Sequence, residues 1–224
     1  MHIRVRNAVP ILLAILYTLS GLTSLTYEVL WARMLSEQFG VSIFGVVITV
    51  AAFMAGLGAG SWLGQRWHSR LPPLFLFGLL EAGVAVYALG LPWSMSSLQH
   101  GLESFAADLQ LSAWYGAQGA VAFFILFLPA FALGMGFPLI LKAATDITTT
   151  PVGSLYGLNT LGACAGALLP LALLPAFGWA TSVEYVAALG GAVGICAMSM
   201  GWRRKAWTSL PAPGERSRVP LADL

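Results

Sequence analysis

A single carboxylate, Glu81, stands near the middle of an apolar stretch of this sequence. In a helix that rises 1.5 Å per residue, this position would lie roughly 15 Å deep in a membrane. Burying a charge in hydrocarbon costs free energy, so ionisable residues in such stretches are often functional. Two interpretations of Glu81 stay open: a site for a proton or an organic cation, or a hydrogen-bonded side chain that fixes helix packing.

Asn159 is the second polar candidate, and it lies among the glycines of an expected helix at 153–174. Its amide could line a cavity at a partly unwound helix, as happens at transporter sites. It could equally hydrogen-bond to a neighbouring helix. Together, Glu81 and Asn159 form the predicted intramembrane site for a cation or a proton.

A third group of candidates is expected at the outer membrane surface, and comprises Tyr27, Glu28, Trp31 and Arg33. Tyr27 and Trp31 are four residues apart and share one helical face, which suits the aromatic belt at a membrane–water interface. The group is either a surface ion pair with an aromatic anchor, or an outer gate or docking point for a partner.

Most enzymatic chemistry has no matching residues. The sequence has no Ser/His or Cys/His pair, no HExxH, no phosphate-binding loop and no cluster with metal-ligand spacing. Cys164 and Cys196 lie singly inside apolar stretches, and no basic cluster interleaved with aromatics suggests nucleic acid. We therefore expect no catalytic residue, no metal, no cofactor and no nucleic-acid partner.

The composition indicates a membrane protein. Hydrophobic residues make up 58% of the 224 positions and charged residues only 9%, whereas a soluble domain carries about 25% charged residues. Apolar runs of about 20 residues suffice to cross a bilayer as helices. The sequence predicts an all-α polytopic membrane protein with six helices, at 8–27, 41–64, 74–93, 114–141, 153–174 and 183–200.

The basic residues give this topology an orientation. With six crossings, ten of the eleven Lys and Arg side chains fall on one side, and Arg33 is the exception. Short loops rich in Lys and Arg remain cytoplasmic, so both termini are expected in the cytoplasm of a bacterium, with the chain multi-pass in the inner membrane. Residues 1–205 are expected to form the membrane domain, and the Pro-rich residues 206–224 a short disordered cytoplasmic tail.

Small residues recur every four positions in two of the expected helices. This spacing lets the backbone of a second helix approach closely, either within one subunit or at an interface that rocks or dimerises. The residues concerned are Gly56, Gly60 and Gly64 in one helix and Gly162 and Gly166 in the other.

Four stretches, read in order, resemble a known family. They are SGLTSLTYEVLWARML at 20–35, AAFMAGLGAGSWLG at 51–64, ALGMGFPLI at 132–140 and VGSLYGLNTLGACAGALLP at 152–170. They resemble the membrane region of the bacterial fused major-facilitator-like/spermidine synthase proteins, over roughly residues 10 to 180. In that family a soluble aminopropyltransferase domain of Rossmann type follows the membrane helices.

The resemblance implies half of a major-facilitator-like fold, because six helices are half of that fold. We expect the soluble synthase domain to be lacking here, so the resemblance transfers no catalytic residue. It leaves three functions open. The first is an accessory subunit of a larger membrane complex. The second is a transporter half that works as a homodimer on a polyamine-like or other small cation. The third is a membrane anchor for a separate Rossmann-type enzyme.

Overall fold

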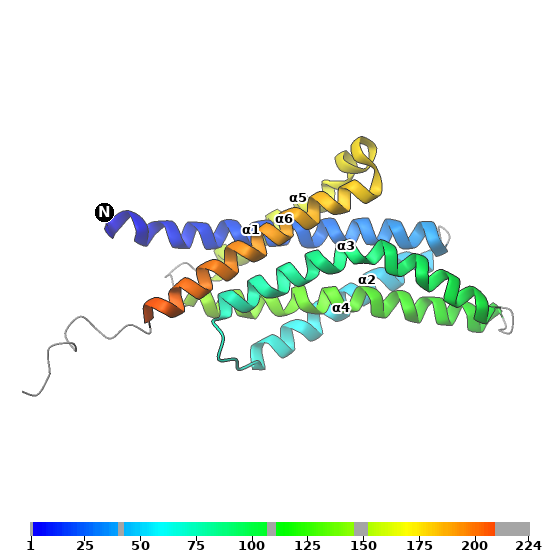
Figure 1. Cartoon of the computed structure of the whole chain (residues 1–224), viewed down its shortest axis with the longest axis horizontal. Helices are drawn as coiled ribbons and strands as arrows, with labels where there is room; N and C mark the ends of the chain where they lie inside the picture. Colours follow the sequence, from blue (N-terminus) through cyan, green and yellow to red (C-terminus); the bar gives the residue numbers. More distant parts are fainter. Residues whose placement is uncertain (1, 40–42, 107–110, 146–151, 209–224) are drawn as a thin grey trace, which may run out of the picture.

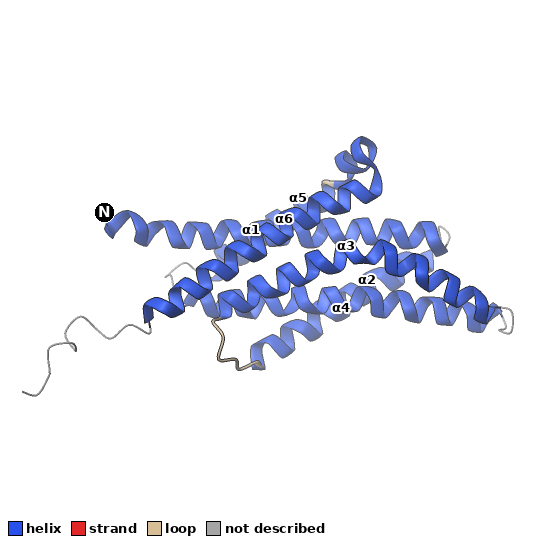
Figure 2. Ribbon diagram, viewed as in Figure 1, coloured by secondary structure: helices blue, strands red, loops and turns tan. Residues whose placement is uncertain are grey.

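The computed structural model describes residues 2–39, 43–106, 111–145 and 152–208, and these residues are helical almost throughout. The helices lie roughly side by side in one bundle, and the described part of the chain has no strand (Figures 1 and 2). They are α1 (His2–Phe39), α2 (Ile43–Arg66), α3 (Pro73–Ala106), α4 (Leu111–Thr145), α5 (Val152–Leu168) and α6 (Pro170–Thr208). Most of the tail expected to be disordered, 209–224, lies outside the described residues.

Five of these helices are long and apolar enough to cross a membrane. Large apolar side chains point outward from them, among them Val86, Phe124 and Ile195, which are 63–71% exposed. Such a surface is stable only in contact with lipid or with another apolar surface. The chain is therefore an all-α polytopic membrane protein. The candidate spans in the described residues are Val9–Ser36, Val46–Arg66, Pro73–Ser94, Gly116–Thr145 and Pro170–Arg203.

Two helices are longer than the sequence predicted. The expected break after Tyr27 does not occur, because α1 continues to Phe39 as one helix. The stretch beyond Tyr27 contains no proline or glycine before Gly40, and it buries Leu30 and Leu35 in the core. Likewise α3, expected to end at residue 93, continues beyond Pro92 and ends at Ala106.

The boundary between α5 and α6 differs from the prediction, although the reversal of chain direction lies where it was expected. α5 ends at Leu168, and a helical turn continues beyond it, since the Leu173 N–H donates to the Leu169 carbonyl. The chain then reverses at Gly178, which adopts φ 74° and ψ 178°. Residues with a side chain rarely adopt this positive φ, whereas glycine adopts it readily because it has no Cβ atom. Figure 1 shows the reversal as the hook in the yellow part of the chain.

Three pairs of helices make the most extensive contacts: α2 with α4, α1 with α5, and α3 with α6. Two further contacts, of α3 with α4 and of α1 with α6, join the pairs into one bundle. Each of these two is tied by a hydrogen bond from a ring to a backbone carbonyl. The Tyr87 hydroxyl on α3 donates to Ile125 at 2.8 Å, and the Trp179 indole on α6 donates to Leu30 at 3.0 Å.

Glycines set the distance between α2 and α4. A Cβ atom on Gly60 would overlap the backbone oxygen of Phe131, and one on Gly134 would overlap that of Leu57. One turn further along, a Cβ atom on Gly64 would lie 3.1 Å from the Met135 oxygen. The two backbones are therefore in direct contact, as small residues allow in membrane helices.

The α1–α5 pair repeats this arrangement. A Cβ atom on Gly162 would overlap the backbone oxygen of Thr18, and one on Gly21 would overlap that of Asn159. One turn further along, a Cβ atom on Gly166 would overlap the backbone oxygen of Leu22. The two glycine-lined contacts thus use the same residue spacings, with α5 in the place of α2 and α1 in the place of α4.

The α3–α6 contact is reciprocal. A Cβ atom on Gly78 would overlap the Gly194 oxygen, and one on Gly194 would lie 2.6 Å from the Gly78 oxygen. The same Cβ atoms would also lie close to the residue four positions further along the other helix, 2.6 Å from the Met198 nitrogen and 2.7 Å from the Ala82 nitrogen. The two helices therefore cross at equivalent points, as in a contact on a local twofold axis.

Candidate functional site

Glu81 lies in the interior of the bundle, where α3 packs against α1 and α6. The Glu81 side chain is only 4% exposed, and the Ser20 hydroxyl on α1 donates a 2.6 Å hydrogen bond to its Oε1 atom. Ser20 itself is 5% exposed. A short hydrogen bond to a buried carboxyl group stabilises the pair, because neither partner has access to water. Both interpretations of Glu81, packing and binding, remain compatible with this contact.

Two tyrosines on α1 are the titratable neighbours of the Glu81 carboxyl group. Tyr17 precedes Ser20 by three residues, and its ring lies 6.3 Å from that of Phe77, which is four residues before Glu81 on α3. Tyr27 follows Ser20 by seven residues, and its hydroxyl lies near Gly190 of α6, as does Ala85, which is four residues after Glu81. Three and seven residues are close to one and two turns, so the three α1 side chains occupy neighbouring positions on one helical side. Among the described residues, the Ser20 hydroxyl is the side-chain group that bonds to this carboxyl group.

Asn159 does not join this site. Its backbone and side-chain oxygens face Gly21 of α1, whereas Ser20 faces Glu81 on α3. Adjacent residues point about 100° apart around a helix, so the two polar groups lie on different sides of α1. The structure therefore separates the two members of the predicted intramembrane site, and leaves Asn159 in a helix–helix contact.

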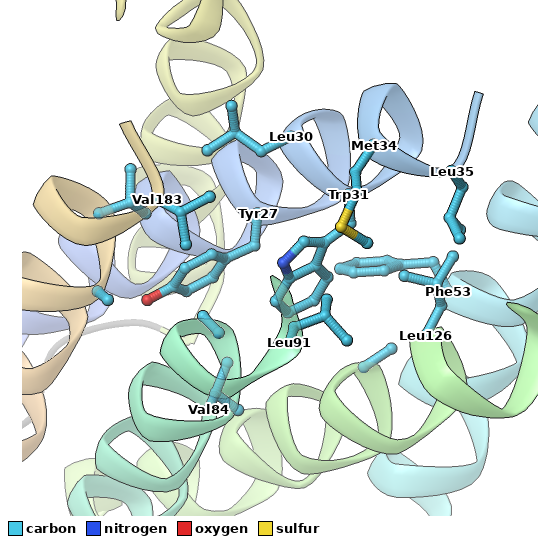
Figure 3. Packing of buried hydrophobic residues seen from close by; sticks show 14 of the residues in the cluster. Tyr27, Leu30, Trp31, Met34, Leu35, Phe53, Val84, Leu91, Leu126 and Val183 are labelled. Carbon is cyan, nitrogen blue, oxygen red and sulfur yellow. The ribbon is translucent and has the colours of Figure 1, made fainter. Parts of the chain in front are cut away.

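The surface position expected for Tyr27 and Trp31 is wrong. Their side chains are 1% and 0% exposed, and they stack with ring centroids 5.1 Å apart in the main apolar cluster. Figure 3 shows both rings directed into the bundle, where Leu91 and Val183 surround them. Aromatic residues four positions apart share one side of a helix, whether that side faces the membrane interface or the protein core. The continuation of α1 beyond Tyr27 places these two rings in the core.

Two polar atoms of these rings are buried without a hydrogen-bond partner, the Tyr27 hydroxyl and the Trp31 indole nitrogen. The other two members of the predicted group are charged. Glu28 is half-buried with its Oε2 atom unpartnered, and Arg33 is exposed. The four residues thus divide into two core rings, one half-buried carboxyl group and one exposed basic side chain.

Lys142 closes the end of the bundle at which α2 terminates. Its ammonium group donates hydrogen bonds of 3.1–3.2 Å to the backbone oxygens of Gly64, Gln65 and Trp67. A cation is favourable there, because the last carbonyl groups of a helix carry partial negative charge and lack helical donors. Nearby, the Arg66 guanidinium lies 4.0 Å from the centre of the Trp62 ring. The helix expected at 114–141 stops one residue before Lys142, whereas α4 continues to Thr145.

Replacing Lys142 with methionine should lower the free energy of unfolding by about 1–2 kcal/mol, because three carbonyl groups lose their shared cation. Reversible unfolding in mixed micelles, followed by tryptophan fluorescence, measures this change. The matched control is Arg203→Met, which removes an exposed basic side chain at the end of α6. An equal loss in both variants would show that net charge, and not the cap, determines the effect.

Ser20 is the residue of this site that the sequence analysis missed. It lies in an apolar helix among other hydroxyl residues, such as Ser24, whose side chain bonds to its own helix. Its location on the same side of the helix as Tyr17 and Tyr27 was the feature of the sequence that could have identified Ser20. Among the described residues, no group of three or more His, Cys, Asp or Glu side chains is placed to hold a metal ion.

Comparison with protein-family models, with curated proteins and with solved structures gives no match. The resemblance to the membrane region of the fused synthase proteins therefore stays a prediction.

Proposed function

We propose that the chain is a non-catalytic, transporter-like membrane unit that works as one half of a larger membrane assembly. The observation that carries this proposal is the repeated packing of its helices. Exchanging α1 with α4, α2 with α5 and α3 with α6 converts the α1–α5 contact into the α2–α4 contact. The same exchange converts the α3–α4 contact into the α1–α6 contact, and it leaves the α3–α6 contact unchanged.

Residue spacings support the same exchange. In the exchange, the pair Gly60–Phe131 corresponds to the pair Gly162–Thr18. The pair Gly134–Leu57 corresponds to the pair Gly21–Asn159. In each contact, the two positions on a helix are three residues apart. Two three-helix repeats packed in this way, with opposite orientations in the membrane, are the plan of each six-helix half of a major-facilitator transporter.

An inverted pair of three-helix repeats requires six crossings, one more than the five candidate spans. We infer that α5 supplies the sixth together with the helical turn that follows it, because the segment from Val152 to Gly178 exceeds the roughly 20 residues needed. Six crossings place both termini on the same side. The excess of Lys and Arg in the ends and loops of that side supports a cytoplasmic location in a bacterial inner membrane.

A half-transporter needs a second half, because substrates of this architecture bind between two six-helix units. The small loops of this chain and the absence of catalytic motifs favour a membrane subunit over an enzyme. The second unit would be another membrane protein, which makes this chain an accessory subunit. Transport by two copies of this chain is the alternative, favoured by the buried Ser20–Glu81 pair.

The proposal is tested by extracting the full chain from its native membrane in mild detergent, sizing the particle and identifying its components by mass spectrometry. A stoichiometric membrane partner is the expected result and supports the accessory subunit. A particle that contains two copies of this chain alone supports the homodimer. A particle of one copy, obtained also by cross-linking in the membrane before extraction, would contradict both forms of the proposal.

A further inference from the structure

The side of α2 opposite its contact with α4 is exposed. Exposed residues recur there at every fourth position, and residues four apart are neighbours on a helix surface. They form a row that slants along the helix and ends at its last residue. The members of this row are Val50, Met54, Gly58, Trp62 and Arg66.

Gly58 makes a gap in this row. A Cβ atom on Gly58 would meet nothing within 4 Å, whereas one on Gly56 or Gly60 would overlap atoms of α4. Neither a close helix contact nor a positive φ therefore accounts for the glycine at position 58. The gap is flanked by two large side chains, Met54 and Trp62, which are 55% and 58% exposed. A flexible hydrocarbon chain can fill such a gap, because it adapts its shape to the helix surface.

Arg66 places a positive charge at the end of the row. Its guanidinium lies 4.0 Å from the centre of the Trp62 ring, whose face attracts the cation. The candidate membrane span of α2 also ends at Arg66, and aromatic and basic side chains are typical of that depth, where lipid headgroups lie. No Asp or Glu stands between Glu37 and Glu81 in the sequence, so neither α2 nor the loop that follows supplies an acidic partner.

Lys142 makes this end of α2 compatible with an anion. The last carbonyl groups of a helix carry partial negative charge, which disfavours a phosphate group. At α2 the Lys142 ammonium offsets that charge, because it donates hydrogen bonds to the carbonyl groups of Gly64, Gln65 and Trp67. The exposed guanidinium of Arg66 is then left to a ligand outside the bundle.

We propose that Met54, Gly58, Trp62 and Arg66 form a binding site for one anionic phospholipid. The Arg66 guanidinium donates hydrogen bonds to the phosphate oxygens, and its planar set of N–H groups can reach two of them at once. Trp62 contacts the glycerol region, and an acyl chain lies in the gap at Gly58. A phospholipid complements both the charge and the apolar row, whereas a soluble phosphate complements Arg66 alone. The site uses only α2, so it does not depend on the identity of the second unit.

Fluorescence quenching by brominated lipids tests this site in the full chain, reconstituted in phosphatidylcholine vesicles. The quencher is phosphatidylglycerol with bromine atoms near the start of its acyl chains, and phosphatidylcholine brominated at the same positions is the reference. The Trp62 signal is the difference between the wild-type protein and Trp62→Phe. Brominated phosphatidylglycerol should quench this signal at a mole fraction at least about tenfold lower than the reference, because a hydrogen bond to a charged group adds about that much affinity.

Variants separate the contributions of charge and gap. Arg66→Gln should abolish the preference for phosphatidylglycerol, and Gly58→Leu should weaken its binding because leucine fills the gap. The matched control is Arg203→Gln, which removes an exposed basic side chain at the end of α6 and should retain the preference. An unchanged preference in Arg66→Gln, or an equal loss in Arg203→Gln, would overturn the proposal. Competition by soluble glycerol phosphate would overturn it as well, since the ligand would then be a soluble anion.

A cross-link in the native membrane distinguishes a lipid from a protein on this side of α2. In a background with Cys164 and Cys196 replaced, a photoreactive group is attached to Met54→Cys, and to Val86→Cys on α3 as the exposed control. Mass spectrometry of the labelled peptides should show anionic phospholipid enriched at position 54 over position 86. The same lipid composition at both positions, or attachment of position 54 to another protein alone, would contradict the lipid site.

Discussion

Replacing Gly60 with leucine should lower the free energy of unfolding by at least about 3 kcal/mol, at or above the upper end of ordinary overpacking. The reason is that the first added carbon already overlaps the backbone oxygen of Phe131. No rotamer relieves an overlap that begins at Cβ, so α2 and α4 must separate along their whole contact. Reversible unfolding in mixed micelles measures the loss, and size-exclusion chromatography shows whether a monodisperse particle survives.

The matched control for Gly60→Leu is Gly58→Leu, on the same helix. A Cβ atom on Gly58 meets nothing within 4 Å, and this position is exposed. Leucine also has a higher helix propensity than glycine, by up to about 1 kcal/mol. Gly58→Leu should therefore leave stability unchanged or slightly raised. Gly162→Leu, at the corresponding position of the α1–α5 contact, should resemble Gly60→Leu. Similar stabilities for the Gly58 and Gly60 variants would contradict the packing described for α2 and α4.

The second large effect is expected at Ser20. Ser20→Ala should lower the free energy of unfolding by about 1–3 kcal/mol, since it leaves a carboxyl oxygen of Glu81 buried without its donor. Removing both groups should cost less than removing Ser20 alone, because replacing a buried polar pair with apolar side chains of similar shape is nearly neutral. The double variant Ser20→Ala/Glu81→Met should therefore be more stable than Ser20→Ala.

The four proteins of this cycle are the wild type, the two single variants and the double variant. Their unfolding free energies give the coupling between Ser20 and Glu81. Ser24→Ala is the control, because the Ser24 hydroxyl bonds to the Ser20 carbonyl of its own helix and not to Glu81. Additive single effects would mean that the hydrogen bond contributes nothing, and that Ser20 is only a small residue at this junction.

Much of the helical organisation could be predicted, because it follows from local composition. The apolar runs around Glu81 predicted α3, and Gly178 stands in the stretch expected to turn back. Glycine spacing indicated close helix contacts at Gly60 and Gly162. These features depend on the length of an apolar run or on the lack of a side chain, and a sequence displays both directly.

The surroundings of individual side chains could not be predicted in the same way. Tyr27 and Trp31 have a spacing that fits the membrane interface and the bundle core equally well, and only the continuation of α1 decides between them. Glu81 and Asn159 are both polar residues in apolar helices. Glu81 of α3 contacts Ser20 of α1, whereas Asn159 of α5 contacts Gly21 of α1. Which faces of two helices meet is set by all of their neighbours together.

The measurement that tests the account most directly is the number of crossings between the α2–α3 loop and the turn at Gly178. In a background with Cys164 and Cys196 replaced, single cysteines are placed at Ser69, in the loop, and at Ala176, beside the turn; both positions are exposed. A membrane-impermeant thiol reagent is then applied to intact cells and to inverted vesicles.

Two inverted three-helix repeats predict that these positions lie on opposite sides. Ser69→Cys should react only in inverted vesicles, and Ala176→Cys only in intact cells. Reaction of both from the same side would mean that α5 does not complete a crossing. That result would leave five spans and contradict the proposal that this chain is one half of a transporter-like assembly.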